Sequence, residues 1–176
     1  MTDAGAETPA LREIVQRGLW FEEFEEGVRY VHRPGRTVTE ADNVLFTTLT
    51  MNPQPLHLDR AFAETQPFGR VLVNSMFTLS TLVGQSVAQL TLGTLVANLG
   101  FGEIAFPAPV FVGDTLSGES VVEGKRLSSS RPGEGVVTLG HTSRNQDGVV
   151  VARCTRSMLV WTREAGERAA AGGARS

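Results

Sequence analysis

The chain is poor in cysteine and carries no excess of basic charge. Its single cysteine, Cys154, cannot form an internal disulfide or supply a thiolate zinc cage. Sixteen basic residues against nineteen acidic ones give a formal net charge of −3. A surface that binds phosphates usually brings a basic excess. We therefore expect neither a disulfide scaffold nor a protein whose partner is nucleic acid.

Targeting and membrane-spanning patterns are also lacking. Residues 1–10 are small and acidic, without the basic start and apolar core of a signal peptide. The most apolar stretch, residues 71–99, is interrupted by Asn, Gln, Ser and Thr. A membrane span needs a run of about eighteen apolar residues. These patterns predict a cytoplasmic protein that makes no contact with a membrane.

The length of 176 residues fits one domain. Residues 1–18 are polar and alanine-rich, so we expect a partly disordered N-terminal arm. Residues 19–163 hold the single domain. The tail, residues 164–176, is mostly Ala, Gly, Arg and Glu, and this composition predicts disorder.

Apolar periodicity predicts one long helix, because large apolar residues recur every three or four positions. They are Leu72, Met76, Leu79, Val83, Val87 and Leu90. The chain beyond the helix is rich in β-branched residues and predicts strands near 95–106, 115–127, 135–145 and 149–161. Tight turns join the last strands, which should pair antiparallel. Together these elements predict an α+β fold.

A shorter helix is expected after Thr39, whose hydroxyl can cap it with help from Asp42. It must end before Asn52-Pro-Gln-Pro, because two prolines this close cannot lie inside a helix. Asp59 is expected to cap a further helix that starts near Arg60.

Three histidines are present, and one lies in a context that suggests chemistry. His57 ends the segment Asn52-Pro-Gln-Pro-Leu-His57, where prolines restrict the backbone. An imidazole transfers protons near neutral pH, and the amides of Asn52 and Gln54 can orient a water or a carbonyl. His32 is expected at an exposed strand end, and His141 inside a strand as a structural residue. Scattered histidines without ligand spacing predict no metal site.

Three segments in the right order resemble the MaoC-like hotdog family. Residues 52–62 resemble its hydratase motif, Asp-x-Asn-Pro-x-His, and residues 106–116 resemble its PV-x-x-GDTL turn. Residues 68–76 resemble the lead-in to its central helix, and the likeness covers about residues 19–161. It implies a hotdog fold, in which a curved antiparallel sheet wraps a long central helix. It also implies a homodimer or larger homo-oligomer.

The activity that the resemblance implies is the reversible addition of water to the double bond of a 2-enoyl-CoA. No cofactor is implied beyond the coenzyme A of the substrate. His57 matches the family's histidine, whereas the aspartate position is Asn52 here and the asparagine position is Gln54. An asparagine can hold a water but cannot take its proton.

The start of the central helix, at Asn74 and Ser75, matches the family's oxyanion site. The backbone N–H of Ser75 would stabilise the enolate oxygen, with the Asn74 side chain as a second donor. The alternative is that both residues only cap or line the helix.

The variant motif further resembles a subgroup that acts on branched C5 dicarboxylyl-CoAs, such as mesaconyl-, itaconyl- and methylmalyl-CoA. A distal carboxylate would favour an arginine, and Arg70 lies near the motif. The alternatives are a non-catalytic hotdog subunit, which Asn52 supports and His57 opposes, and an acyl-CoA thioesterase. The subunit would bind acyl thioesters or complete a heterodimer. A thioesterase needs a carboxylate where the chain has Asn74-Ser75.

Overall fold

The structure, a computed structural model, describes residues 11–173. One antiparallel sheet carries its strands in the order β1–β4–β5–β6–β3, and β2 pairs with β4 beside it. The strands are β1 (Arg29–Val31), β2 (Arg36–Thr37), β3 (Leu95–Ala105), β4 (Thr115–Leu127), β5 (Glu134–Arg144) and β6 (Val150–Trp161). The four long strands lie within one residue of their predicted ends. They confirm the prediction from β-branched residues and turn positions.

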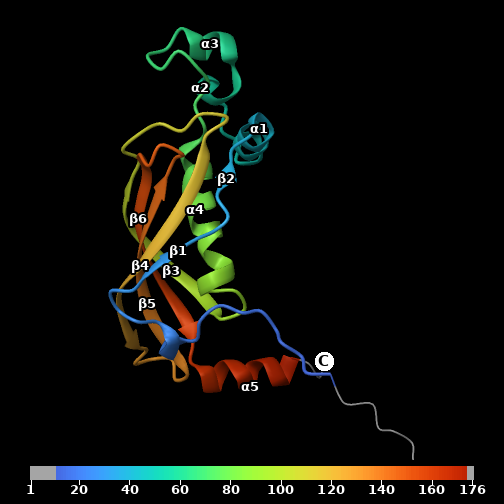
Figure 1. Ribbon diagram of the computed structural model, residues 1–176, viewed down its shortest axis with the longest axis vertical. Coiled ribbons are helices and arrows are strands. Elements are labelled where there is room, and N and C mark those ends of the chain that lie inside the picture. The colour runs from blue at the N-terminus through green and yellow to red at the C-terminus, as the bar shows by residue number, and fades with distance from the viewer. Residues whose placement is uncertain (1–10, 174–176) are drawn as a thin grey trace, which may run out of the picture.

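The long helix α4 (Ser75–Leu90) runs along one face of this sheet (Figure 1). It begins three residues later than the apolar periodicity starts, because the Asn74 side chain caps it by accepting from the N–H of Met76. A long helix covered by an antiparallel sheet is the arrangement that the hotdog resemblance implies. None of the helices formed by residues 11–173 has the length and apolar character to cross a membrane.

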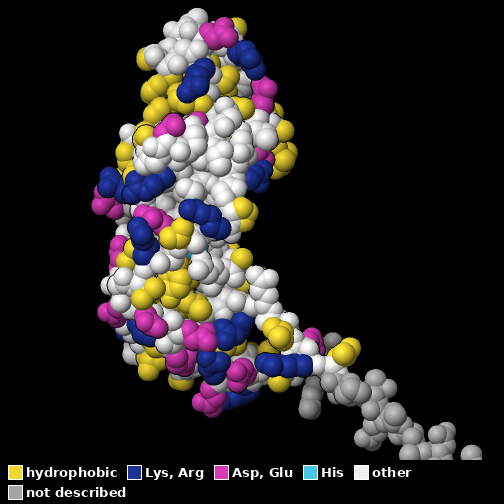
Figure 2. Space-filling view, viewed as in Figure 1, with side chains coloured by type: hydrophobic (Ala, Val, Ile, Leu, Met, Phe, Trp, Pro, Cys, Tyr) yellow, Lys and Arg dark blue, Asp and Glu magenta, His cyan; other side chains and the backbone are white. Residues whose placement is uncertain are grey.

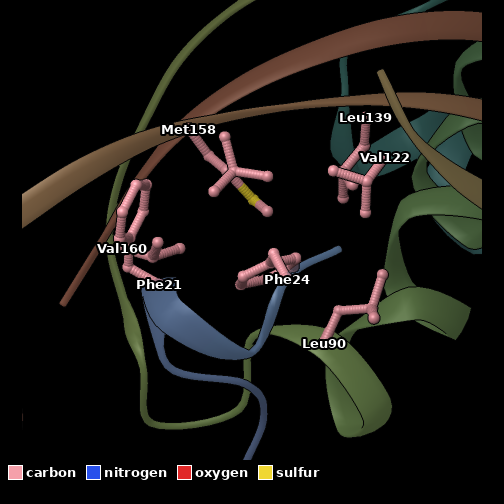
Figure 3. Close-up of a cluster of buried hydrophobic side chains, with 8 residues drawn as sticks. Phe21, Phe24, Leu90, Val122, Leu139, Met158 and Val160 are labelled. Carbon is pink, nitrogen blue, oxygen red and sulfur yellow. The ribbon is translucent and has the colours of Figure 1, made fainter. Parts of the chain in front are cut away.

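The main core lies between the end of α4 and the sheet (Figure 3). Its aromatic members come from the N-terminal segment, where η1 (Phe21–Glu23) places Phe21 and Phe24 against the inner sheet face. Burying one such side chain contributes about 1.5–3 kcal/mol to stability. The remaining buried members are Leu90, Val122, Val137, Leu139, Met158 and Val160.

Three short helices lie beyond one end of the sheet (Figure 1), namely α1 (Glu40–Leu49), α2 (Pro55–Leu58) and α3 (Arg60–Glu64). Thr39 and Asp42 form the expected capping box of α1, and the Asp59 carboxylate caps α3 as predicted. The apolar side of α1 is not the buried side: Leu45 is 61% exposed. Figure 2 shows apolar side chains at the surface of this part of the molecule.

The expectation of a disordered tail over residues 164–176 needs correction. Residues Arg163–Gly173 form the helix α5, and only residues 174–176 of the tail lie outside the described chain. The helix packs against the N-terminal segment: Gly166 lies under the Trp20 ring, and the first amide of α5 donates to the Glu22 carboxylate. These contacts, between residues far apart in the sequence, stabilise a helix that has a polar composition.

The N-terminal arm expected over residues 1–18 is described only in part. Residues 1–10 lie outside the described chain, and residues 11–17 are exposed and form no helix or strand. Gly18 and Leu19 already belong to the domain, because their amides donate to the carbonyls of Leu92 and Leu90.

His32 also differs from its expected place, since it is buried rather than exposed at a strand end. Its Nε2 lies 2.7 Å from the Ser120 hydroxyl, and the same hydroxyl lies 2.7 Å from Nδ1 of His141. Nδ1 of His32 lies 3.0 Å from the Gln89 side-chain oxygen. This buried chain links α4 to the inner sheet face, which makes both histidines structural residues.

Acid should destabilise the protein through His141. Burial, together with the nearby charge of Arg156, lowers the pKa of His141 to about 3. In the unfolded chain the His141 imidazole binds a proton below about pH 6.5, whereas in the folded chain it stays neutral down to about pH 3. Over that window the free energy of unfolding should fall by about 1.4 kcal/mol per pH unit from this residue. At higher pH the contribution is constant.

Urea unfolding of the wild type and of His141→Asn between about pH 7.5 and pH 4.5 measures this effect. Other acid-sensitive groups, His32 among them, remain in both proteins. The variant should therefore show a shallower pH slope, lower by about one proton. Equal slopes in the two proteins would show that His141 is protonated in the folded state.

Candidate active site

A pocket of about 270 Å³ lies where the start of α4 meets α2 and the segment before β4. Most of its wall is apolar, with Phe68, Leu72, Phe106 and Val151 among the lining residues. The polar residues in the wall are His57, Ser75 and Thr78. An apolar pocket with a few convergent polar groups is the usual form of a site for a small molecule or an acyl chain.

The fold around His57 fixes its ring in one tautomer. Pro55 occupies the first position of α2, and its carbonyl accepts from the N–H of Asp59, so His57 lies in a closed helical turn. Its Nδ1 lies 2.9 Å from the carbonyl oxygen of Leu72. A carbonyl only accepts, so Nδ1 carries the proton and Nε2 keeps a lone pair in the neutral ring. His57 can therefore take a proton from a molecule in the pocket.

Ser75 is the first residue of α4, and it lines the same pocket as His57. The first amides of a helix have no carbonyl partner within it and point toward its N-terminal end. They stabilise negative charge that forms there. The structure thus brings together two of the residues singled out in the sequence, a histidine and a helix N-terminus.

The structure places the Asn74 side chain in the cap of α4 and not in the pocket wall. The residue is 4% exposed and is not part of the pocket wall. Its Oδ1 accepts from the N–H of Met76 at 3.0 Å, and its Nδ2 donates to the Thr47 hydroxyl at 3.3 Å. Both ends of the amide are used within the fold, and the capping contact matches the alternative drawn from the sequence.

Asn52 and Gln54 lie outside the pocket wall as well. The side-chain oxygen of Asn52 accepts from the N–H of Gln54 at 3.0 Å, which stabilises the turn into α2. The Gln54 side chain is exposed. Among residues 11–173 no carboxylate lines this pocket, and His57 is its single titratable side chain.

Arg70 lines an adjoining pocket of about 250 Å³, together with Glu40, Arg60 and others. Its guanidinium carbon lies 3.4 Å from the ring centroid of Phe111. Phe111 in turn meets the edge of Phe68 at 6.3 Å between ring centroids, and Phe68 belongs to the wall of the His57 pocket. One aromatic pair therefore separates Arg70 from that pocket.

Asn43 is the site residue that reasoning from the sequence missed. It lies on α1, is 1% exposed, and its side chain bonds to backbone atoms of His57, Leu72 and Asn74. A signal was present, because Asn43 and Thr47 stand four positions apart and so share one face of the helix. In the part of the chain that the structure describes, no cluster of His, Cys, Asp and Glu could hold a metal ion.

Comparison with known proteins decides the family. The family model described as "MaoC like domain" matches residues 23–145, well over half of the chain. The chain belongs to the MaoC-like family. This MaoC-like chain is 34% identical over 148 residues to the beta-methylmalyl-CoA dehydratase of Chloroflexus aurantiacus, covering 84% of the chain and 41% of that protein.

A second relative of this MaoC-like chain is the mesaconyl-CoA hydratase of Cereibacter sphaeroides, at 31% identity over 147 residues, 84% of the chain and 42% of that protein. The chain thus spans about two-fifths of the length of these curated relatives. A solved Mycobacterium tuberculosis protein described as a double hotdog fold superimposes with a TM-score of 0.73 at 23% identity, covering 82% of the chain and 44% of that protein. This likeness shows the hotdog fold.

Proposed function

We propose that this chain is the hotdog domain of a hydro-lyase that adds water reversibly to the double bond of a short-chain 2-enoyl-CoA. The observation that carries the proposal is the His57 ring, held by its Nδ1 bond to the Leu72 carbonyl in an apolar pocket that contains the N-terminus of α4. The names of the relatives, a dehydratase and a hydratase of CoA esters, support the same reaction class.

The proposed reaction uses one base. The thioester carbonyl accepts from the backbone N–H of Ser75, and the apolar wall holds the acyl chain. Nε2 of His57 removes a proton from water while the water oxygen bonds to C3, and the π electrons of the C2=C3 bond form an enolate. The protonated ring then delivers that proton to C2, and the carbonyl is restored. His57 serves both steps, because the amide of Asn52 cannot take a proton.

For the substrate we propose a branched C5 dicarboxylyl-CoA of the mesaconyl or itaconyl type. The relatives' names support this choice. Within the described residues no cation lines the His57 pocket, so the distal carboxylate would reach Arg70 past the Phe68–Phe111 pair. A guanidinium stacked on an aromatic ring keeps its N–H donors in a plane that matches a carboxylate.

We further propose that two copies of the chain form a homodimer. The relatives are more than twice as long as the matched region, and one solved neighbour holds two hotdog folds in one chain. A second copy would supply the second hotdog. The edge strand β3 supports this pairing, because it ends the sheet and exposes Leu99, Phe101 and Ile104.

A hydration assay tests the function. The purified 176-residue chain would be given crotonyl-, mesaconyl-, itaconyl- and a medium-chain enoyl-CoA, with loss of enoyl absorbance as the readout. We expect the fastest turnover on a C5 dicarboxylyl-CoA. Faster turnover of crotonyl-CoA would keep the reaction class and refute the substrate. No turnover by folded protein would favour the second candidate, a non-catalytic subunit, for which Asn52 in the aspartate position is the supporting observation.

Arg70→Ala should separate the two kinds of substrate. Loss of a hydrogen bond to a charged group is worth about 1.5–3 kcal/mol, so kcat/KM for mesaconyl-CoA should fall about 10- to 150-fold. Crotonyl-CoA has no distal carboxylate, and its kcat/KM should stay within about twofold. The matched control is Arg60→Ala, since Arg60 lines the same adjoining pocket but is ion-paired to Glu40. Equal losses on both substrates would remove Arg70 from carboxylate recognition.

A further inference from the structure

The side chain of Asn43 joins three separate segments of the site. Its Nδ2 donates to the carbonyl oxygen of His57 at 3.0 Å and to that of Leu72 at 3.1 Å. Its Oδ1 accepts from the backbone N–H of Asn74 at 2.9 Å. Both amide hydrogens and one lone pair are therefore used, and they tie α1 to α2, to the segment before α4, and to the cap of α4.

Each of these bonds bears on a group that the proposed reaction uses. The Leu72 carbonyl that Asn43 holds is the same carbonyl that fixes Nδ1 of the His57 ring. The amide of Asn74, which Asn43 also holds, directly precedes Ser75, the proposed oxyanion donor. One buried side chain thus sets the distance between the base and the oxyanion donor.

The chemistry of the position selects asparagine. Two carbonyl oxygens and one N–H must be satisfied from a single point, and a primary amide of this length offers two donors and an acceptor. An aspartate would place carboxylate oxygens against the carbonyls of His57 and Leu72 with no hydrogen to give. An aliphatic residue would leave all three backbone groups without this partner.

We propose that Asn43 is a positioning residue, which holds the His57 ring and the first turn of α4 in register for hydration. The inference rests on the proposed function of His57. A displacement of about 1 Å at a reacting group can cost about 100-fold in rate, so loss of these bonds should lower activity by about 10- to 100-fold. Asn43 itself touches no atom of the substrate in this scheme, so its replacement should lower kcat and leave KM nearly unchanged.

The test compares Asn43→Ala and Asn43→Asp with Thr47→Ser. Thr47 is equally buried on the same face of α1, one turn further on, and serine keeps the hydroxyl that accepts from the Asn74 side chain while removing a buried methyl group. With crotonyl-CoA as the probe, both Asn43 variants should lose kcat by about 10- to 100-fold with KM within about threefold. Thr47→Ser should stay within about twofold. Equal losses in all three would overturn the proposal, because they would reflect a loosened α1 alone.

A second readout does not depend on turnover. In protein labelled with ¹⁵N at histidine, the wild type should show the neutral His57 ring with its proton on Nδ1, and Asn43→Ala should show a mixture of tautomers. An unchanged tautomer together with unchanged kcat would overturn the proposal. If the wild type hydrates none of the four thioesters and the tautomer still shifts only in the Asn43 variants, the contact stands and the proposed function fails.

Should both variants fail to fold, the wild type still provides a test. The side-chain amide protons of Asn43 are buried and bonded to two carbonyls, so they should exchange with solvent far more slowly than those of the exposed Gln54. Exchange at the same rate as Gln54 would overturn the proposal. Asn43→Ser, which keeps one donor, should then fold and show an intermediate kcat.

Discussion

His57→Ala is expected to lower kcat/KM on the preferred enoyl-CoA by about 10²- to 10⁴-fold, the usual contribution of a positioned acid–base group. The effect should reach the upper part of this range, because among residues 11–173 no other titratable side chain lines the pocket. In an active site with two proton-transferring groups, the remaining group can support part of the activity after the first is removed. Here the same ring both takes the proton from water and returns it to C2.

The control is Leu58→Ala, the next position on the same short helix, where the side chain is 39% exposed. It should retain activity within about twofold, since exposed substitutions change stability by about 0.5 kcal/mol or less. Circular dichroism should show both variants folded. If His57→Ala retained more than about a tenth of wild-type activity, proton transfer would have to be assigned to a group from outside the described chain.

Most of the fold could be predicted from local patterns. The strands β4, β5 and β6 carry runs of β-branched residues between turns, and Gly148 adopts the positive φ that the expected hairpin requires. Such signals lie within a few residues of one another, so a sequence displays them directly. The start of α4 was harder, because apolar spacing continues through Leu72 while the cap that begins the helix is the polar Asn74.

The errors concern residues whose structure depends on distant partners. The helix α5 has a composition typical of a flexible tail, and its stability comes from contacts with Trp20 and Glu22, about 140 positions earlier in the chain. His32 looked like an exposed strand end, but its partners are Gln89 and Ser120. Nothing in the neighbouring sequence indicates such pairings.

The site shows the same division. His57 was found from its proline-restricted context and the family motif, and Ser75 from the motif alone; the structure places both in one pocket wall. Asn43 carries no motif, and its role is defined by bonds to residues 14 to 31 positions away. Polarity alone would place an asparagine on the exposed side of α1. The structure buries Asn43, where its amide pairs with three backbone groups, and leaves Leu45 exposed.

Gly135→Ala should destabilise the protein by about 1–3 kcal/mol, the usual cost of forcing extra atoms into a packed core. Gly135 lies on β5 beneath the ring of Phe21, and a methyl group there would overlap the ring. Phe21 lies on η1 in the N-terminal segment and belongs to the core. A shift of η1 away from the sheet would expose its ring to solvent. The free energy of unfolding, measured with urea, should fall by this amount.

The matched control is Gly124→Ala on the neighbouring strand β4, where a methyl group would meet nothing within 4 Å. There the loss of backbone freedom in the unfolded chain should leave stability unchanged or raise it by about 0.4–1 kcal/mol. Combining Gly135→Ala with Phe21→Leu should cost less than the sum of the two single changes, because the smaller side chain leaves room for the methyl group. Additive costs would show that the Phe21 ring does not lie on Gly135 in solution. The packing of the N-terminal segment against the core would then not account for the cost of Gly135→Ala.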